Sequence, residues 1–333
     1  MREPVSRPLV SVLLPVRDGG DRLLAAVESL CRQEYRELDI LVVDDHSTDG
    51  APQRAAALDP RVRVLPNPGR GIVAALNAGA AAARGALLAR MDADDIAHPQ
   101  RIGTQVALLA ARPDLGIVGA QVEVAGGGAG WRRYVDWLNG LTEPGDIARE
   151  IFVESPIPHP TAMFRREVFQ DLGGYREVPW PEDYDLWLRA WAAGVAMAKP
   201  EGVLLTWRDH PARLSRASGR YGPQAFRRAR AHFLARTLLR NRAAVVWGAG
   251  PTGRRLADAL LAEGVDIAGF IDVHPRRVGG TKRGRLVHGP GFALRAAPAL
   301  VVVAVGAAGA REEIRGWCAD HGLAEGTDFI FAA

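Results

Sequence analysis

The sequence predicts an α/β fold in which a mixed sheet flanked by helices is followed by a second, smaller α/β domain. Over the first 125 residues, short apolar runs alternate with amphipathic helical patterns, as is typical of a largely parallel sheet with helices on its faces. The same alternation begins again at Ala243. The length of 333 residues also exceeds what one hydrophobic core usually holds. We therefore expect domains at residues 1–223 and 243–333, linked by a basic helix at residues 224–242.

The first domain is expected to begin with strands separated by helices. Strands are predicted at Leu9–Val16, Asp39–Asp44, Arg61–Leu65, Ala86–Met91 and Leu115–Val124. Asp21 can cap the first helix and Pro52 suits the first position of the second, and two more helices are expected at Ile72–Arg84 and Pro99–Ala111. Because ligands of such sheets bind beyond the carboxyl ends of the strands, we expect Pro15, Asp44 and Asp92 to share one binding edge.

The pattern changes after the fifth predicted strand. The tract Gly126–Gly130 indicates either the tip of a surface hairpin or a mobile loop beside an active site. Further strands are expected at Thr161–Phe164 and Val203–Trp207, and helices at Arg165–Leu172 and Glu182–Ala193. From Gln224 to Arg242, apolar positions are interspersed with arginines, which predicts a helix between the domains or one that lies on a membrane surface.

Composition limits the compartment and the partners. The formal charge is +4 with Lys199 and Lys282 the only lysines, and a modest positive field favours phosphate-bearing ligands or an anionic membrane without indicating nucleic acid. Cys31 and Cys318 fall in different predicted domains, so we expect reduced thiols. No apolar run has the roughly 18 residues needed to span a bilayer. A cytoplasmic protein, soluble or peripheral at the inner face of the membrane, is the expectation.

Two acidic clusters carry the chemistry that the sequence suggests. Asp92, Asp94 and Asp95 follow an apolar run, and carboxylates crowded in this way repel one another unless a cation neutralises them. Mn²⁺ or Mg²⁺ shared with a diphosphate fits, because these ions prefer oxygen ligands and take few carboxylates from the protein. Glu182 and Asp183 open a helix and suit a catalytic base. Helix capping and the helix dipole are the structural alternatives for the two clusters.

Taken together, these tracts resemble the family 2 glycosyltransferases of the GT-A fold, over roughly residues 8 to 215. The resemblance rests on the following tracts in order: Val10–Asp18, Val42–Asp49, Ala74–Gly79, Ala89–Ile96, Pro158–Arg165, Gly173–Tyr175, Glu182–Arg189 and Arg208–His210. The family usually has glycine where His46 stands. Any one tract is a weak signal, whereas this many in the family's order is a strong one.

The resemblance implies a metal-dependent inverting glycosyltransferase. It would move a sugar from a nucleotide diphosphate sugar, UDP-linked in our reading, to a glycan or lipid-linked acceptor in surface polysaccharide biosynthesis. Asp183 would be the base and Glu182 its support. The implied metal ligands are Asp94 and His210, and the implied donor contacts are Pro15, Asp44, Asn77, Asp92, Asp95 and Arg208, with Asp44 reading the nucleobase. For Asn77 a role on the helix surface is equally open. For His159, which stands between two prolines, a role that shapes a loop is the alternative, and for His210 a structural role is equally open.

The second domain carries a dinucleotide-type fingerprint. Gly248, Gly250 and Gly253 follow the predicted strand Ala243–Trp247 and open a helix, and Asp272 stands about twenty residues on, at the end of the strand Ile267–Asp272. A third strand is expected at Leu300–Val305. The domain resembles small Rossmann-like domains, for which NAD or another nucleotide and a structural or oligomerising role both stay open. The alternative function is therefore a nucleotide-sugar oxidoreductase or epimerase, and a third is a sugar-nucleotide binding module without activity.

Overall fold

The computed structural model describes residues 7–125, 129–208, 213 and 219–333. The chain divides into two compact units. One consists of Met1–Ile147, Pro156–Val178 and Asp185–Ala217, and the other of Ala148–Ser155, Pro179–Tyr184 and Ser218–Ala333. The boundary between the units therefore passes through two helices, α6 (Pro144–Glu150) and α8 (Glu182–Ala192).

A mixed sheet forms the centre of the first unit, with the strand order β3-β2-β1-β4-β8-β6-β9. Strands β1 to β4 are parallel, β8 is antiparallel to both of its neighbours, and β9 is parallel to β6. The strands are β1 (Val10–Val16), β2 (Leu38–Asp44), β3 (Val62–Pro66), β4 (Leu87–Arg90), β6 (Leu115–Val118), β8 (Met163–Arg165) and β9 (Ala196–Ala198). This is a parallel-rich α/β architecture, as the sequence predicts.

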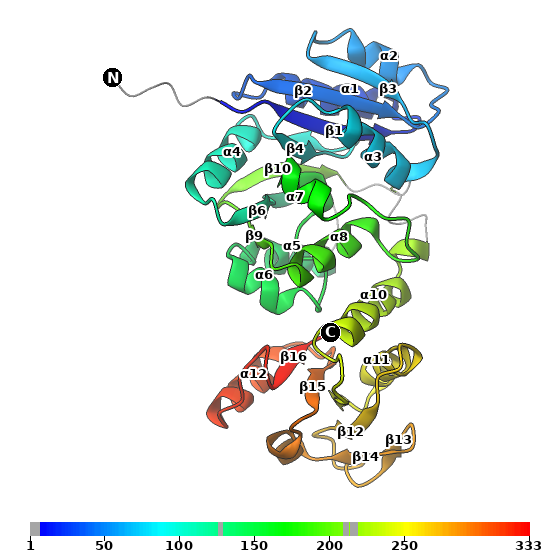
Figure 1. Cartoon of the computed structure of the whole chain (residues 1–333), viewed down its shortest axis with the longest axis vertical. Coiled ribbons are helices and arrows are strands. Elements are labelled where there is room, and N and C mark those ends of the chain that lie inside the picture. Colours follow the sequence, from blue (N-terminus) through cyan, green and yellow to red (C-terminus); the bar gives the residue numbers. More distant parts are fainter. Residues whose placement is uncertain (1–6, 126–128, 209–212, 214–218) are drawn as a thin grey trace. The chain divides into compact units, whose positions relative to one another are not determined.

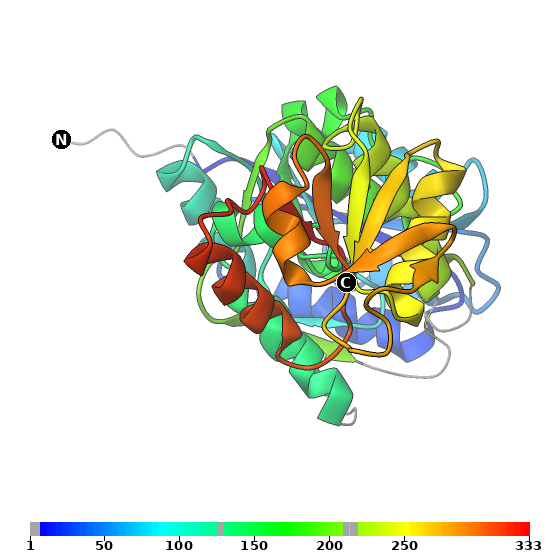
Figure 2. The ribbon, with the colours of Figure 1, turned by 90° about the horizontal axis from the view of Figure 1, so that it is seen from below.

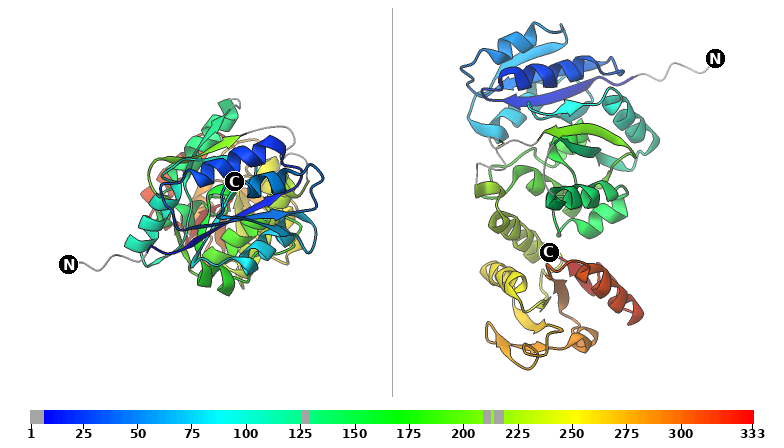
Figure 3. Two further views of the ribbon diagram at one scale, coloured as in Figure 1. Left: turned by 90° about the horizontal axis from the view of Figure 1, so that it is seen from above. Right: turned by 180° about the vertical axis from the view of Figure 1, so that it is seen from behind.

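Helices cover both faces of this sheet. The N-terminal ones are α1 (Gly20–Cys31), α2 (Ala51–Ala56), α3 (Gly71–Ala82) and α4 (Arg101–Ala111). In Figure 1, α3 lies in front of the strands, and in the view from behind in Figure 3, α1 lies in front of them. Every residue of β1 except Pro15 is buried, as expected of a strand covered on both faces. Asp21 lies inside the first turn of α1 instead of capping it, because the helix begins one residue earlier, at Gly20.

A small second sheet lies beside the first, with the order β5-β10-β7. It consists of β5 (Ile96–Ala97), β7 (Gln121–Ala125) and β10 (Val203–Arg208). The predicted single strand Leu115–Val124 is wrong in this respect, because the chain leaves the large sheet after Val118 and joins the small one at Gln121. A Cβ at Gly119 would lie 2.8 Å from the Ile157 side chain, so glycine permits this close passage.

The first part of the chain also contains further helices, of which α7 (Arg166–Asp171) contacts β8. They are α5 (Ala129–Gly140), α6, η1 (His159–Thr161), α7 and α8. Trp187 on α8 is fully buried and stacks on Phe164 of β8, with ring centroids 5.7 Å apart. The expected hairpin tip or mobile loop at Gly126–Gly130 lies largely outside the described residues.

The C-terminal part of the second unit is built on a six-stranded sheet with the order β13-β14-β12-β11-β15-β16. Its pairings are parallel except for β13 with β14. Figure 2 shows its strands as the yellow-to-red fan, with helices to either side. The elements are α10 (Pro223–Arg236), β11 (Ala244–Trp247), α11 (Pro251–Ala262), β12 (Ile267–Ile271), β13 (Thr281–Lys282), β14 (Arg285–His288), β15 (Leu300–Val303), α12 (Ala310–Asp320) and β16 (Phe329–Phe331), with short 3₁₀ turns η2 (Gly219–Tyr221) and η3 (Pro290–Arg295).

The basic helix is shorter than predicted. It ends at Arg236 instead of Arg242, where the Thr237 hydroxyl donates to the Phe233 carbonyl at 2.6 Å and the Leu239 amide donates to the Leu234 carbonyl at 2.8 Å. These contacts close the helix without the glycine or proline that usually marks an end in a sequence. Among the described residues, no helix combines the length and the apolarity required to cross a bilayer.

Candidate active site

The register of the sheet brings the ends of three strands together. Val16 of β1 lies opposite Asp44 of β2, and Leu13 of β1 lies opposite Arg90, the last residue of β4. The Met91 amide then donates to the Leu13 carbonyl at 3.1 Å, so Asp92 follows directly beyond the strand. The prediction that Pro15, Asp44 and Asp92 share the carboxyl edge of the sheet is confirmed.

Three carboxylates gather at this edge. Asp92, Asp94 and Asp95 each present one oxygen, and the three oxygens lie within 4.8 Å of one another. Asp95 is completely buried, whereas Asp92 and Asp94 are half-buried. Among the described residues, Oδ2 of Asp95 has no hydrogen-bond partner although it is shielded from solvent. A buried carboxylate oxygen without a partner is costly, which indicates that the cluster is built for something that binds to it.

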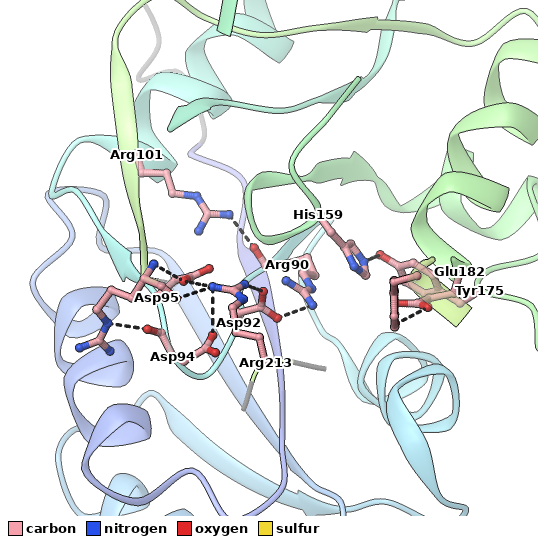
Figure 4. Close-up of polar contacts among 11 residues, drawn as sticks. Arg90, Asp92, Asp94, Asp95, Arg101, His159, Tyr175, Glu182 and Arg213 are labelled. Atoms are coloured by element: carbon pink, nitrogen blue, oxygen red, sulfur yellow. Dashed lines mark hydrogen bonds and ion pairs between the residues drawn. The ribbon is translucent and has the colours of Figure 1, made fainter. Parts of the chain in front are cut away.

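Arginines surround the carboxylates, as Figure 4 shows. Arg90 Nη2 lies 2.5 Å from Asp92 Oδ1, and the Arg208 backbone amide donates to Asp95 Oδ1 at 2.9 Å. Arg208 also donates through Nε to the Asp94 carbonyl. Arg213 donates through Nη2 to Asp92 Oδ2 at 2.8 Å and through Nη1 to Asp95 Oδ1 at 3.0 Å. The chain around Asp92 and the two arginines Arg208 and Arg213, which lie far apart in the sequence, therefore form one polar cluster.

The arrangement pushes the pKa values of neighbouring carboxyl groups apart. Burial, reinforced by Asp92 and Asp94 and opposed by Arg213, raises the pKa of Asp95 to about 7. For Asp92 burial has the same tendency, but Arg90 and Arg213 outweigh it and lower the pKa to about 2. The surroundings of Asp92 therefore favour its ionised form, whereas the burial of Asp95 favours its protonated form.

Arg101 contacts the end of β4, just before the aspartates in sequence, through the Arg90 carbonyl. It is fully buried on α4 and donates through Nη2 to the Arg90 carbonyl at 2.6 Å, while Nη1 has no partner among the described residues. Burial, reinforced by Arg90 and opposed by Asp95, lowers the pKa of Arg101 to about 9. Sequence reasoning missed Arg90, Arg101 and Arg213 as site residues. The signal for Arg90 was an arginine inside an otherwise apolar strand, whereas nothing in the local pattern singled out Arg213.

The predicted donor contacts Asp44 and Asn77 both bond backbone groups of the protein in this structure. Asp44 Oδ1 accepts from the Ser47 amide at 2.8 Å, which shapes the turn after β2. The Asn77 side-chain amide bonds both backbone groups of Tyr175, at 2.9 and 3.0 Å, and so ties α3 to a loop 98 residues away. His46 has φ of +62°, in the left-handed region that favours glycine, which accounts for the glycine usual in the family at this position.

The predicted catalytic pair lies at the start of α8, within the second compact unit. Glu182 is buried, and the Tyr221 hydroxyl lies 2.8 and 3.0 Å from its two carboxylate oxygens. Asp183 is half-buried, and its Oδ1 accepts from the Tyr184 amide at 2.8 Å. Asp92, Asp94 and Asp95 belong to the first unit, so the facing of the two acidic groups stays a prediction. His210, the predicted second metal ligand, lies outside the described residues.

The glycines of the loop after β11 differ in whether a side chain would fit at their positions. Gly248 has φ of +125°, and a Cβ there would lie 2.5 Å from the Ala304 carbonyl oxygen, while a Cβ at Gly253 would lie 1.8 Å from the Gly248 carbonyl oxygen. A Cβ at Gly250 would meet only the Arg277 guanidinium, at 3.5 Å. Gly248 and Gly253 are thus required by packing alone, whereas Gly250 leaves the loop surface open.

Asp272 is already engaged at the same loop. Its carboxylate accepts from the Ala249 amide at 2.9 Å, the His274 amide at 2.8 Å and Arg277 Nη1 at 3.0 Å. Burial opposes ionisation, but these donors outweigh it and lower the pKa of Asp272. In this structure Asp272 therefore stabilises the loop itself.

A parallel-rich α/β sheet with carboxylates beyond its strand ends is the architecture of GT-A-type glycosyltransferases. The fold of this chain matches the crystal structure of residues 1–349 of S. aureus TarS in complex with UDP-GlcNAc, with a TM-score of 0.58 at 15% identity. The match covers 77% of this chain and 72% of the TarS chain. The mannosyltransferase PcManGT from Pyrobaculum calidifontis, in complex with GDP-Man and Mn²⁺, matches with a TM-score of 0.51 at 21% identity, over 78% and 74%. These likenesses concern the fold.

Sequence comparison identifies the family. The family model "Glycosyl transferase family 2" matches residues 11–173. EpsE of Bacillus subtilis (strain 168), which is named as a glycosyltransferase, is 34% identical over 199 residues, or 57% of this chain and 69% of EpsE. The amylovoran biosynthesis glycosyltransferase AmsE of Erwinia amylovora is 29% identical over 204 residues, or 59% and 75%. The chain belongs to glycosyltransferase family 2.

The carboxylate cluster fits the divalent cation that this family often uses. The three oxygens lie within 4.8 Å of one another, whereas oxygens that share one Mg²⁺ lie at most about 4 Å apart, twice the metal–oxygen distance, so the carboxylates would draw together around an ion. Oδ2 of Asp95 is buried and has no hydrogen-bond partner among the described residues, so a bound cation would offset the cost of its burial. Among the described residues, the donor set of this cluster consists of carboxylate oxygens, which suit Mg²⁺ or Mn²⁺ better than a softer metal.

Proposed function

We propose that this protein is a metal-dependent inverting glycosyltransferase that uses a nucleotide diphosphate sugar, with UDP as the first choice of nucleotide. The observation that carries the proposal is the group of three aspartates at the strand ends of a family 2 chain, which present oxygens within 4.8 Å of one another. One of them, Asp95, is buried and has a carboxylate oxygen without a hydrogen-bond partner among the described residues. Carboxylates held in this way suit a cation shared with a diphosphate. TarS, whose complex holds UDP-GlcNAc, and PcManGT, whose complex holds GDP-Man and Mn²⁺, support the donor class.

The metal would be held by Asp94, with His210 as a second ligand and Asp92 and Asp95 beside it. When bound, such an ion supplies a Lewis acid that stabilises the charge of the departing diphosphate. The arginines hold the chain's own groups in place: Arg90 fixes Asp92 through the 2.5 Å contact, and Arg208 fixes the Asp94–Asp95 turn through its backbone amide and Nε. The fork of Arg208 is suited to phosphate as well.

The donor would lie along the carboxyl edge of the sheet. Pro15 and Asp44 stand at the ends of adjacent strands, where the nucleoside would bind, with Asp44 reading the base, and Asn77 is proposed nearby for the ribose or diphosphate. Because the Asn77 amide already bonds the Tyr175 backbone, we assign Asn77 a positioning effect on this edge as well as a donor contact.

The acceptor hydroxyl must lose a proton as it attacks, and Asp183 is proposed to take it. Glu182, held by Tyr221, would orient Asp183 or the acceptor. A single displacement with one base inverts the anomeric carbon. The relatives EpsE and AmsE favour a glycan or lipid-linked acceptor in surface polysaccharide biosynthesis, and we place the protein in the cytoplasm, in peripheral contact with the membrane.

A second nucleotide site is proposed on the Rossmann-like C-terminal domain, at residues 243–333. The observation that favours it is Gly250, whose missing Cβ leaves the loop surface open to a ligand except for the flexible Arg277. NAD or another nucleotide would lie against Gly248, Gly250 and Gly253, and Arg277 would exchange its bond to Asp272 for a phosphate. A purely structural or oligomerising role is the competing assignment for this domain.

A panel of nucleotide diphosphate sugars tests the main proposal. Release of nucleoside diphosphate that requires Mn²⁺ or Mg²⁺ supports it, and loss of this release in Asp94→Asn locates the site. A nicotinamide absorbance change with the same substrates would instead favour the oxidoreductase or epimerase, and binding without turnover would favour the inactive module. Titration of NAD into the protein, in the absence of sugar donor, tests the second site. If NAD binds there, Gly250→Val should block the binding.

A further inference from the structure

A cationic side chain of the protein itself lies among the three aspartates. Arg213 reaches Asp92 and Asp95 at 2.8 and 3.0 Å, and its Nη1 is 4.0 Å from Asp94 Oδ1. Its Nη1 also donates to the Arg208 carbonyl at 2.7 Å, and its guanidinium carbon lies 5.4 Å from the centre of the Trp207 ring. Figure 4 shows this guanidinium between the carboxylates. One charged group of the chain therefore lies within 4.0 Å of all three aspartates of the cluster.

A divalent cation and this guanidinium compete for the same oxygens. Asp92 Oδ1 is already paired with Arg90, so Oδ2 is its remaining oxygen, and Arg213 holds it. Two cations about 4 Å apart in a partly buried site repel each other more than they would in bulk water. With Arg90, Arg101 and Arg213 close to three aspartates, the cluster has no excess negative charge to attract a free ion.

Arg213 satisfies the cluster incompletely. Oδ1 of Asp95 accepts from Arg213 and from the Arg208 amide, yet Oδ2 of the same buried carboxylate has no partner among the described residues. A planar guanidinium directs its N–H groups within one plane and cannot reach all the oxygens of three carboxylates. A spherical ion has no such restriction. The unpartnered oxygen thus points to an occupant other than Arg213 in the working enzyme.

We propose that Arg213 is an exchangeable counter-cation, which neutralises the aspartates when no metal is bound and leaves them for the donor diphosphate when metal and donor bind together. This inference rests on the proposed function. A diphosphate offers the guanidinium an equally good bidentate partner, so Arg213 loses no ion pair in the exchange. The consequence is strong positive coupling: Mn²⁺ binds weakly alone and tightly with nucleoside diphosphate, and each ligand raises the affinity for the other by the same factor.

Titration of MnCl₂ into the full-length protein, followed by the electron paramagnetic resonance of free Mn²⁺, tests the proposal with and without UDP. For the wild type we expect UDP to tighten Mn²⁺ binding by at least about tenfold. For Arg213→Gln we expect Mn²⁺ alone to bind at least about tenfold more tightly than it binds the wild type, and the effect of UDP on Mn²⁺ to shrink accordingly. Arg36→Gln is the matched control, because Arg36 is exposed and this substitution removes the same charge at another place in the protein. The control variant should bind Mn²⁺ as the wild type does.

The outcomes separate this inference from the proposed function. If Arg213→Gln binds Mn²⁺ alone with wild-type affinity while Asp94→Asn loses Mn²⁺ binding in the presence of UDP, the metal site stands and the exchange is overturned. If neither the wild type nor Asp94→Asn binds Mn²⁺ even with UDP, the proposed metal site itself fails. Should Arg213→Gln not fold, the wild type still decides, because a Mn²⁺ affinity that UDP leaves unchanged overturns the exchange.

Discussion

Asp95→Asn is expected to remove a pH-dependent loss of stability from the metal-free protein. Burial raises the pKa of Asp95 from 3.8 to about 7, so between these values the folded chain keeps a proton that the unfolded chain has released. Wild-type stability therefore falls as the pH rises through this window, by up to about 1.4 kcal/mol per pH unit and by about 4 kcal/mol in all. Asparagine carries no titrating proton, so relative to wild type the variant should gain this amount between about pH 4 and pH 7 and nothing above it.

The assay is urea unfolding at intervals from pH 4 to pH 8, in the presence of a chelator that removes metal. Asp39→Asn serves as the control, because Asp39 is also buried but its pKa is lowered, burial being outweighed by Arg63 and Ser11. A lowered pKa contributes stability that is fully present above about pH 4 and is lost only below it. The deficit of Asp39→Asn should therefore stay constant from pH 5 to pH 8.

The reasoning is refuted if the difference between Asp95→Asn and wild type is the same at pH 4.5 and pH 7.5, or if it shifts in favour of wild type. The result bears on function because a carboxylate that destabilises the fold at neutral pH needs a ligand to account for it. Mn²⁺ and UDP together should stabilise Asp95→Asn less than they stabilise the wild type.

Three further predictions concern Lys199, Asn77 and Tyr221. Burial lowers the pKa of Lys199 from 10.5 to about 7. The free energy of unfolding of the wild type should therefore rise with pH between these values, by up to about 1.4 kcal/mol per pH unit, and that of Lys199→Met should lack this rise. An equal pH slope in the two proteins contradicts the prediction. Asn77→Ala removes both bonds to Tyr175 and should cost about 1–3 kcal/mol in urea unfolding, and an unchanged midpoint speaks against the clamp. Tyr221→Phe should lower kcat/KM for transfer about tenfold or more with UDP affinity unchanged, because Glu182 loses a donor; wild-type kcat/KM removes Tyr221 from the account.

The strand ends that carry the aspartates were predictable because their signals are local. The apolar runs before Asp44 and Asp92 predict buried strands, and parallel pairing then aligns their carboxyl ends whatever the details of the loops. The motif order added the family. The same locality explains the near-agreement of α8, predicted at Glu182–Ala193 and found at Glu182–Ala192.

The contacts that complete the cluster were not predictable from local patterns. Arg213 reaches Asp92 across 121 residues, and the sequence around it resembles any arginine-rich surface segment. Arg101 lies on a helix whose pattern places it on the buried face, but its value to the site depends on the Arg90 carbonyl, which only the tertiary structure brings close. Likewise, the break between β6 and β7 depends on whether Ile157 packs beside Gly119, which no window of the sequence contains.

Calorimetric titration of UDP in the presence of Mn²⁺, on the wild type, Asp94→Asn and Asp183→Asn, tests the central claim most directly: the aspartates at the strand ends bind the metal and the diphosphate, and a separate carboxylate serves as base. The account predicts that Asp94→Asn weakens UDP binding at least about tenfold and makes it insensitive to Mn²⁺, whereas Asp183→Asn binds UDP as the wild type does but no longer transfers sugar. Mn²⁺-dependent UDP binding of wild-type strength in Asp94→Asn would contradict it.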